Sequence, residues 1–138
     1  MTPSDGPRET ATPDGVSVRE ATPRDLAAVL SVLDAAALET DADRVQSGTD
    51  DGDVLVAASG NETVVGALVL DGDEVANVAV RRRRRGQGIG TALVAAAAAR
   101  RERLTAAFDA DLRAFYGSLG FAVEPLSDGR FRGTLDAE

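Results

Sequence analysis

The sequence has no cysteine, no histidine, no lysine and no tryptophan. Without cysteine the chain forms neither a disulfide nor a thiolate metal site. Without histidine it lacks the commonest general base and the commonest zinc ligand, so no metal site is expected and acid–base chemistry is left to carboxylates, the single tyrosine and water. No apolar run has the length needed to span a bilayer. We therefore expect a cytoplasmic protein that does not enter a membrane.

Positive charge is also scarce. The 15 basic residues are all arginine and stand against 23 acidic ones, which gives a net charge of −8. Such a surface stays soluble by self-repulsion and suits a high-salt interior, where screening weakens that repulsion. This composition is typical of a halophilic protein. An acidic chain is also a poor candidate for non-specific binding to DNA.

A length of 138 residues predicts one domain with one core. Residues 1–15 hold three of the five prolines and almost no apolar side chains. Such a segment buries too little apolar surface to fold, so we expect a disordered N-terminal segment over residues 1–15. The folded domain is then expected over residues 16–138.

Three segments have helical character. Thr22-Pro23-Arg24-Asp25 combines a capping threonine, a proline at the first helical position and an acid three residues on. Apolar residues at helical spacing follow it over residues 26–37, and the same spacing recurs over residues 112–119. Residues 91–101 are rich in alanine, which has the highest helix propensity. Residues 41–53 are polar and rich in Asp and Gly, so we expect a loop there.

The remaining apolar segments predict strands. Three of them, separated by turn residues, form an antiparallel meander in the middle of the chain. The expected strands cover residues 16–19, 54–58, 63–70, 74–80, 104–108, 121–123 and 130–135. The resulting order, β-α-β-β-β-α-β-α-β-β, predicts an α/β or α+β domain in which helices cover the faces of a single sheet.

A glycine-rich segment, residues 86–90, separates the strand ending at Val80 from the alanine-rich helix. A loop in this position points several backbone N–H groups and the positive end of the helix dipole at one spot, which favours a pyrophosphate. A Walker A loop requires lysine, which the chain lacks. The dinucleotide fingerprint requires glycine where Thr91 stands, and it follows the first strand of a parallel βαβ unit rather than a meander.

The segment Arg85-Gly86-Gln87-Gly88-Ile89-Gly90 resembles the Gln/Arg-x-x-Gly-x-Gly/Ala pyrophosphate loop of the GNAT N-acetyltransferase superfamily. Downstream, Phe115-Tyr116-Gly117-Ser118-Leu119-Gly120-Phe121 resembles the Phe-Tyr-x-x-x-Gly-Phe segment of the same family. The resemblance runs from about Glu74 to Phe121. It implies a single-domain GNAT fold with a mixed, mostly antiparallel sheet of about six or seven strands flanked by helices.

The resemblance also implies an activity. Members of this family transfer the acetyl group of acetyl-CoA to a primary amine by direct attack in a ternary complex. The sequence does not identify the acceptor, which is either a small molecule or a peptide. A homodimer is a further possibility, because dimers are common for this fold.

Two residues are catalytic candidates. The resemblance implies that Tyr116, the only tyrosine, protonates the CoA sulfur; the alternative is that it belongs to the apolar face of its helix. Some family members carry a catalytic glutamate where Glu74 stands, and alternation along the strand places Glu74 on one face with Ala76, Val78 and Val80. A carboxylate there can deprotonate the amine through a water, while the alternative is a solvated acid beside Asp73.

The donor contacts are implied by the same motifs. In this family the pantetheine arm pairs with the strand before the loop, near a local bulge, and the pyrophosphate sits on the loop. The cofactor-binding candidates are Val78, Ala79, Val80, Arg85, Gly86, Gln87, Gly88, Ile89, Gly90, Thr91 and Asp109. Asp109 stands where the family often has an asparagine that contacts pantetheine, and an ionised carboxylate only accepts hydrogen bonds.

Two other functions fit parts of the sequence. One is a GNAT-fold sensor that binds acyl-CoA without efficient catalysis. The aspartate at position 109, which departs from the family's asparagine, is compatible with this alternative. The other is a nucleic-acid-binding module that uses the five arginines of residues 81–85. That module requires a basic face and stacking aromatics, whereas the chain is acidic and its five aromatic residues do not interleave with the arginines.

Overall fold

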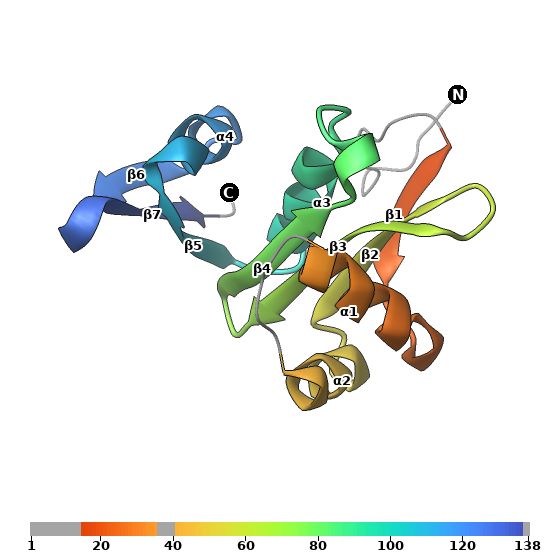
Figure 1. The fold of residues 1–138 in the computed structure, drawn as a ribbon. Helices are drawn as coiled ribbons and strands as arrows, with labels where there is room; N and C mark the ends of the chain where they lie inside the picture. The colour runs from red at the N-terminus through yellow and green to blue at the C-terminus, as the bar shows by residue number, and fades with distance from the viewer. Residues whose placement is uncertain (1–14, 36–40, 137–138) are drawn as a thin grey trace, which may run out of the picture.

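Seven strands form one mixed sheet in the order β1-β2-β3-β4-β5-β7-β6. The computed structural model describes residues 15–35 and 41–136 (Figure 1). The strands are β1 (Val16–Glu20), β2 (Val54–Ser59), β3 (Val64–Asp71), β4 (Glu74–Val80), β5 (Arg103–Asp109), β6 (Ala122–Pro125) and β7 (Arg130–Asp136). The segment expected to be disordered, residues 1–15, lies outside the described residues apart from Gly15.

Four α-helices flank the sheet in the described part of the chain: α1 (Leu26–Ala35), α2 (Ala42–Asp50), α3 (Ile89–Ala98) and α4 (Arg113–Ser118). Short 3₁₀ turns are η1 (Pro23–Asp25), η2 (Arg82–Arg84), η3 (Ala110–Leu112) and η4 (Ser127–Gly129). The expected α/β fold class and the expected strands are confirmed, with α2 as the one added helix. None of these helices is long and apolar enough to cross a membrane.

The predicted helix start at Thr22 is confirmed, and Asp25 organises it. Asp25 Oδ2 accepts hydrogen bonds from the backbone N of Thr22 at 2.7 Å and from its Oγ1 at 3.1 Å. Arg19 Nη1 also donates to Asp25 Oδ2, at 2.8 Å. The Arg19 hydrogen bond, opposed by burial and helped by the two Thr22 hydrogen bonds, lowers the pKa of Asp25 to about 2. The side chain therefore ties β1 to the beginning of α1.

The prediction of a loop over residues 41–53 is wrong, because α2 forms there. Asp41 caps the helix, since its side chain accepts a hydrogen bond from the backbone N of Asp43 at 3.0 Å. Val45 is fully buried in the core on the side of α1, and Thr49 Oγ1 donates to the Val45 carbonyl at 2.8 Å. One buried apolar side chain and a good cap thus hold a short helix that is otherwise polar.

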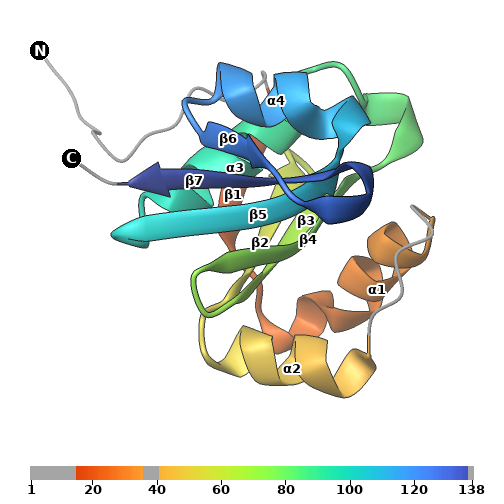
Figure 2. The same cartoon turned by 90° about the vertical axis from the view of Figure 1, so that its left-hand side faces the viewer.

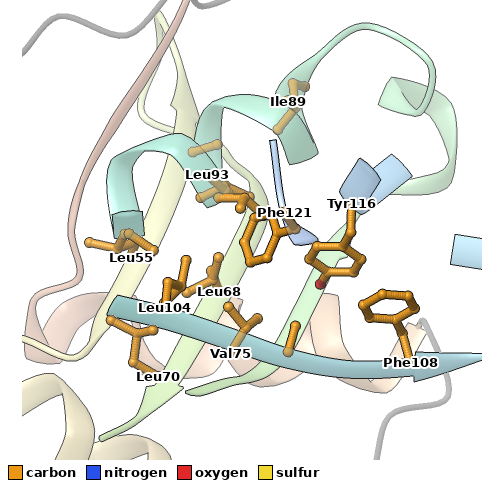
Figure 3. Packing of buried hydrophobic residues seen from close by; sticks show 14 of the residues in the cluster. Leu55, Leu68, Leu70, Val75, Ile89, Leu93, Leu104, Phe108, Tyr116 and Phe121 are labelled. Atoms are coloured by element: carbon orange, nitrogen blue, oxygen red, sulfur yellow. The ribbon is translucent and has the colours of Figure 1, made fainter. Parts of the chain in front are cut away.

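The sheet separates two hydrophobic clusters. The larger one joins α3 and α4 to one face of the sheet, and Leu68, Leu93 and Phe108 belong to it (Figure 3). The smaller one packs α1 and α2 against the opposite face (Figure 2). Gly66 of β3 permits the close approach of α3, because a Cβ there would lie 3.1 Å from Cγ2 of Ile89.

The sheet is split between β4 and β5. These strands are parallel and share a single pair, Glu74 with Thr105, whereas β5 pairs with β7 along its full length. Beyond that pair, residues 75–80 of β4 have no β5 partner in the described part of the chain. The two parts of the sheet therefore meet only near the beginning of β4 (Figure 1).

A β-bulge interrupts β4 near the split. Val69 pairs with Asn77 and Leu70 pairs with Val75, so Ala76 is the extra residue on β4. A bulge shifts the alternation of side chains by one position. Val75, Val78 and Val80 therefore face the α3 cluster, while Ala79 faces the α1 cluster.

Candidate active site

A cavity of about 840 Å³ lies where β4 ends, next to the glycine loop and to α4. Most of the predicted cofactor-binding residues line it. They are Val78, Ala79, Val80, Arg85, Gly86, Gly88, Ile89, Gly90 and Thr91. Its volume falls within the range of small-molecule sites, roughly 300–1,000 Å³.

Two predicted cofactor residues do not line the cavity. Gln87 Oε1 accepts a hydrogen bond from Arg84 Nε at 2.9 Å, so its side chain braces the loop. Asp109 Oδ1 forms an ion pair with Arg130 Nη1 at 3.0 Å, and its side chain is 70% exposed. The structure thus directs the Asp109 side chain towards β7 rather than into the cavity.

The glycine loop takes a conformation that favours glycine at two positions. Gly86 has φ of 78°, and Gly88, the N-cap of α3, has φ of 88°. The backbone N–H groups of Ile89, Gly90 and Thr91 have no partner inside the helix, because they belong to its first turn. Within the described residues, Gly86, Gln87 and Gly88 also donate no backbone hydrogen bond. The loop therefore presents a set of free donors at the positive end of a helix, an arrangement that favours an anion.

The arginines beside this loop differ from the others. Across the described residues, none of the five arginines at positions 81–85 forms an ion pair with a carboxylate. The arginines that do form ion pairs are Arg19, Arg44, Arg100, Arg101, Arg103 and Arg130. Arg84 and Arg85 line the cavity, and Arg85 Nε donates to the Val80 carbonyl at 3.0 Å. Positive charge is therefore concentrated beside the glycine loop in a chain with net charge −8.

Tyr116 combines burial with access to the cavity. The residue is only 3% exposed, and its ring stacks on Phe108 at 4.4 Å and meets Phe121 edge-on at 5.2 Å (Figure 3). Its side chain lines the cavity, and its hydroxyl has no hydrogen-bond partner among the described residues. Burial raises the pKa of Tyr116 to about 12. Like an ordinary tyrosine, Tyr116 is neutral near pH 7 and carries a hydroxyl proton.

Glu74 lies apart from this cavity. Its side chain is exposed, at the beginning of β4, where β4 and β5 still pair. The prediction that Glu74 shares a face with Val78 and Val80 is wrong, because the bulge at Ala76 reverses the alternation. Glu74 pairs with Asp71, whose side chain forms an ion pair with Arg44 of α2, so Glu74 lies on the α1–α2 side of the sheet.

The cavity also contains residues that were not among the predicted site residues. They are Arg84, Asp111, Leu112 and Phe115. Leu112 and Phe115 share the helical spacing of Tyr116, so that spacing was a usable signal. Phe115 touches the loop, because its Cζ lies 3.6 Å from the position of a Cβ built on Gly90. Nothing in the sequence distinguishes Asp111 from the other acidic residues.

The family profile described as "Acetyltransferase (GNAT) domain" matches residues 50–123, which is more than half of the chain. The chain belongs to the GNAT acetyltransferase family. It is accordingly an acyltransferase, of a family whose cosubstrate is acetyl-CoA. The matched region contains both the glycine loop and Tyr116, so the resemblance seen in the sequence is confirmed.

Solved GNAT structures share the fold along almost the whole chain. Ard1 from Thermoplasma volcanium is 19% identical with a TM-score of 0.73, and the match covers 90% of this chain and 99% of that one. Arabidopsis thaliana Naa50, in complex with the bisubstrate analogue CoA-Ac-MVNAL, is 15% identical with a TM-score of 0.69, covering 89% and 99%. A GNAT acetyltransferase from Streptococcus agalactiae is 11% identical with a TM-score of 0.71, covering 94% and 99%. No curated protein matches the sequence significantly.

Proposed function

We propose that this GNAT protein binds acetyl-CoA in the cavity beside β4 and transfers the acetyl group to a primary amine in a ternary complex. One observation carries the proposal. Tyr116, whose buried hydroxyl has no hydrogen-bond partner among the described residues, lines the same cavity as the glycine loop. A buried polar group without a partner usually marks a site that a ligand or water completes. The catalytic domain is assigned to residues 16–138.

The cavity residues fit the parts of acetyl-CoA. The free N–H groups at the start of α3, with Arg84 and Arg85, suit the pyrophosphate. The edge of β4 at residues 78–80 pairs with no strand among the described residues. It suits the amides of the pantetheine arm, because an extended chain can add to an exposed strand edge. The apolar side chains of Leu112 and Phe115 suit the aliphatic segments between them.

Acetyl-CoA supplies an activated acyl group, and the protein has to manage two protons. The amine nitrogen bonds to the acyl carbon as the carbon–sulfur bond breaks. Tyr116, whose phenol is neutral at pH 7, donates a proton to the departing sulfur. An alkylamine is mostly protonated at pH 7 and has to lose a proton before it attacks. We assign that proton to Glu74, through water, on the face of the sheet opposite the cavity.

A peptide N-terminus is the first acceptor class to test. The Naa50 structure, which shares the fold, holds an analogue that joins CoA to the peptide sequence MVNAL. Peptides and small amines both present the primary amine that the reaction requires. A suitable panel therefore contains the pentapeptide MVNAL, spermidine and the free amino acids.

The test of this proposal is release of the CoA thiol from acetyl-CoA in the presence of each amine. Wild-type protein is expected to turn over at least one amine, and Tyr116→Phe is expected to lower kcat on the order of 10²-fold, because it removes the proton donor. Gly117, next to Tyr116, lies outside the cavity, so Gly117→Ala serves as the control and is expected to keep its turnover. Binding of acetyl-CoA without turnover of any amine would instead support a sensor.

A further inference from the structure

We infer that Asn77 positions the amine acceptor, which reaches the split between β4 and β5 from the α1–α2 side of the sheet. This inference rests on the proposed function. It adds a residue that neither motif contains, on the face of β4 that carries Val69 and Ala79.

The bulge at Ala76 gives Asn77 its orientation. β4 carries only two polar side chains, those of Glu74 and Asn77, and regular alternation would place them on opposite faces. Because Ala76 is the extra residue, Asn77 pairs with Val69 and Glu74 pairs with Asp71. Paired residues in an antiparallel ladder share a face. Val69 belongs to the α1–α2 cluster, so both polar side chains of β4 lie on that side.

Asn77 also lies next to the reaction cavity along the chain. Its neighbour Val78 lines the cavity from the α3 side, while Asn77 borders the same strand from the opposite side. Residues 75–80 of β4 lack a β5 partner in the described part of the chain, so no strand closes the sheet beside Asn77. A substrate approaching from the α1–α2 side meets the donor at this opening.

The amide of Asn77 has no protein hydrogen-bond partner among the described residues. The residue is half-buried. Its neighbours on that face, Val69 and Ala79, are buried and apolar and provide no partner. The hydrogen-bond partner of this amide therefore comes from water or from a bound substrate.

The chemistry of an asparagine suits an attacking amine. The Oδ1 atom accepts a hydrogen bond from the amine N–H and so orients the nitrogen lone pair. Glu74 lies on the same face at a distance of roughly 7 to 10 Å along the strand, a span that ordered water can bridge. Asn77 is therefore a positioning residue, and the proton that the nitrogen loses leaves towards Glu74.

The experiment compares Asn77→Ala, Asn77→Asp and the control Asn61→Ala. Asn61 is exposed in the turn between β2 and β3, where its Oδ1 already interacts with Ser59 Oγ. Each variant is assayed with the best amine of the panel above, and acetyl-CoA affinity is measured separately by calorimetry. Asn77→Ala is expected to lower kcat/KM for the amine about 10-fold without changing the Kd of acetyl-CoA. Asn77→Asp retains acceptor oxygens at the same position and is expected to restore most of this loss.

Three results would overturn the inference. The first is an Asn77→Ala variant with wild-type kcat/KM for the amine. The second is equal impairment of the Ala and Asp variants together with a lowered Tm, which would indicate a structural role. The third is a loss confined to acetyl-CoA affinity. If wild-type protein acetylates no amine, both the proposed function and this inference fail. If wild-type protein acetylates an amine and Asn77→Ala does so equally well, only this inference fails.

Discussion

Titration of Tyr116 with base tests whether its hydroxyl lies in a desolvated cavity. The chain has one tyrosine and no tryptophan, lysine, histidine or cysteine. Between pH 9 and 12 the phenol is therefore the only side chain expected to change its charge, because the arginines lose their protons at higher pH. Burial raises its pKa from 10.0 to about 12. This difference corresponds to about 3 kcal/mol that favours the neutral phenol in the folded protein.

The sign of the pH dependence follows from the raised pKa. The unfolded chain loses the phenolic proton near pH 10, while the folded protein keeps it until about pH 12. The contribution of Tyr116 to the free energy of unfolding is therefore complete below pH 10 and is lost as the pH rises to about 12. A protein with Tyr116→Phe has no such group and is expected to show a flat free energy of unfolding over this window.

Two measurements check this prediction. Ultraviolet absorbance follows the phenolate directly, and circular dichroism at each pH reports whether the protein is still folded. We expect the phenolate to appear near pH 12 or together with unfolding. A phenolate that forms near pH 10 in fully folded protein would show that the hydroxyl is solvated, and the assignment of Tyr116 as a buried proton donor would be wrong.

Three further predictions concern stability. Because Arg19 lowers the pKa of Asp25 from 3.8 to about 2, its stabilisation is present above pH 3.8 and is lost as the pH falls to about 2. Asp25→Asn should therefore lower the free energy of unfolding at pH 7 by about 2 kcal/mol and flatten the acid limb of a urea-denaturation series; an unchanged acid limb would contradict the ion pair. Gly66→Ala would place a Cβ 3.1 Å from Ile89 Cγ2 and 3.2 Å from the Ala79 carbonyl oxygen. We therefore expect the free energy of unfolding to fall by roughly 1–3 kcal/mol, and a rise in the thermal midpoint would contradict this packing. The net charge of −8 makes the surface repel itself. Raising KCl from about 0.1 M to 1 M shortens the Debye length from about 10 to 3 Å, which weakens this repulsion and should raise the thermal midpoint. A midpoint that falls would contradict the halophilic interpretation.

The elements predicted from sequence were those with strong local signals. The meander of β2, β3 and β4 follows from valine-rich segments between turn residues, and the start of α1 follows from its capping residues. Helix α2 was missed because only Val45 of its residues is buried and apolar, so its segment has no helical periodicity to detect. The cap at Asp41 and the burial of Val45 against α1 stabilise this helix instead.

The site was predicted where it depends on a contiguous motif. The glycine loop and Tyr116 lie in one cavity, as the motifs indicated. The positions of Glu74 and Asn77 were not predictable, because a bulge at Ala76 leaves no mark in a run of small and branched residues. The Asp109 side chain lies outside the cavity, where it forms an ion pair with Arg130. The two residues are 21 positions apart, so the motif could not indicate this contact.

The central claim is that the glycine loop binds the pyrophosphate of acetyl-CoA. It is tested most directly by calorimetric titration of acetyl-CoA into wild-type protein and into two variants, Gly88→Glu and Gly129→Glu. Both glycines have positive φ and open space around them, but only Gly88 lines the cavity, so the two substitutions impose similar strain and the same charge. We predict saturable binding by wild-type protein and by Gly129→Glu, and a loss of binding in folded Gly88→Glu. Absence of binding by folded wild-type protein, or equal binding by all three proteins, would contradict the account.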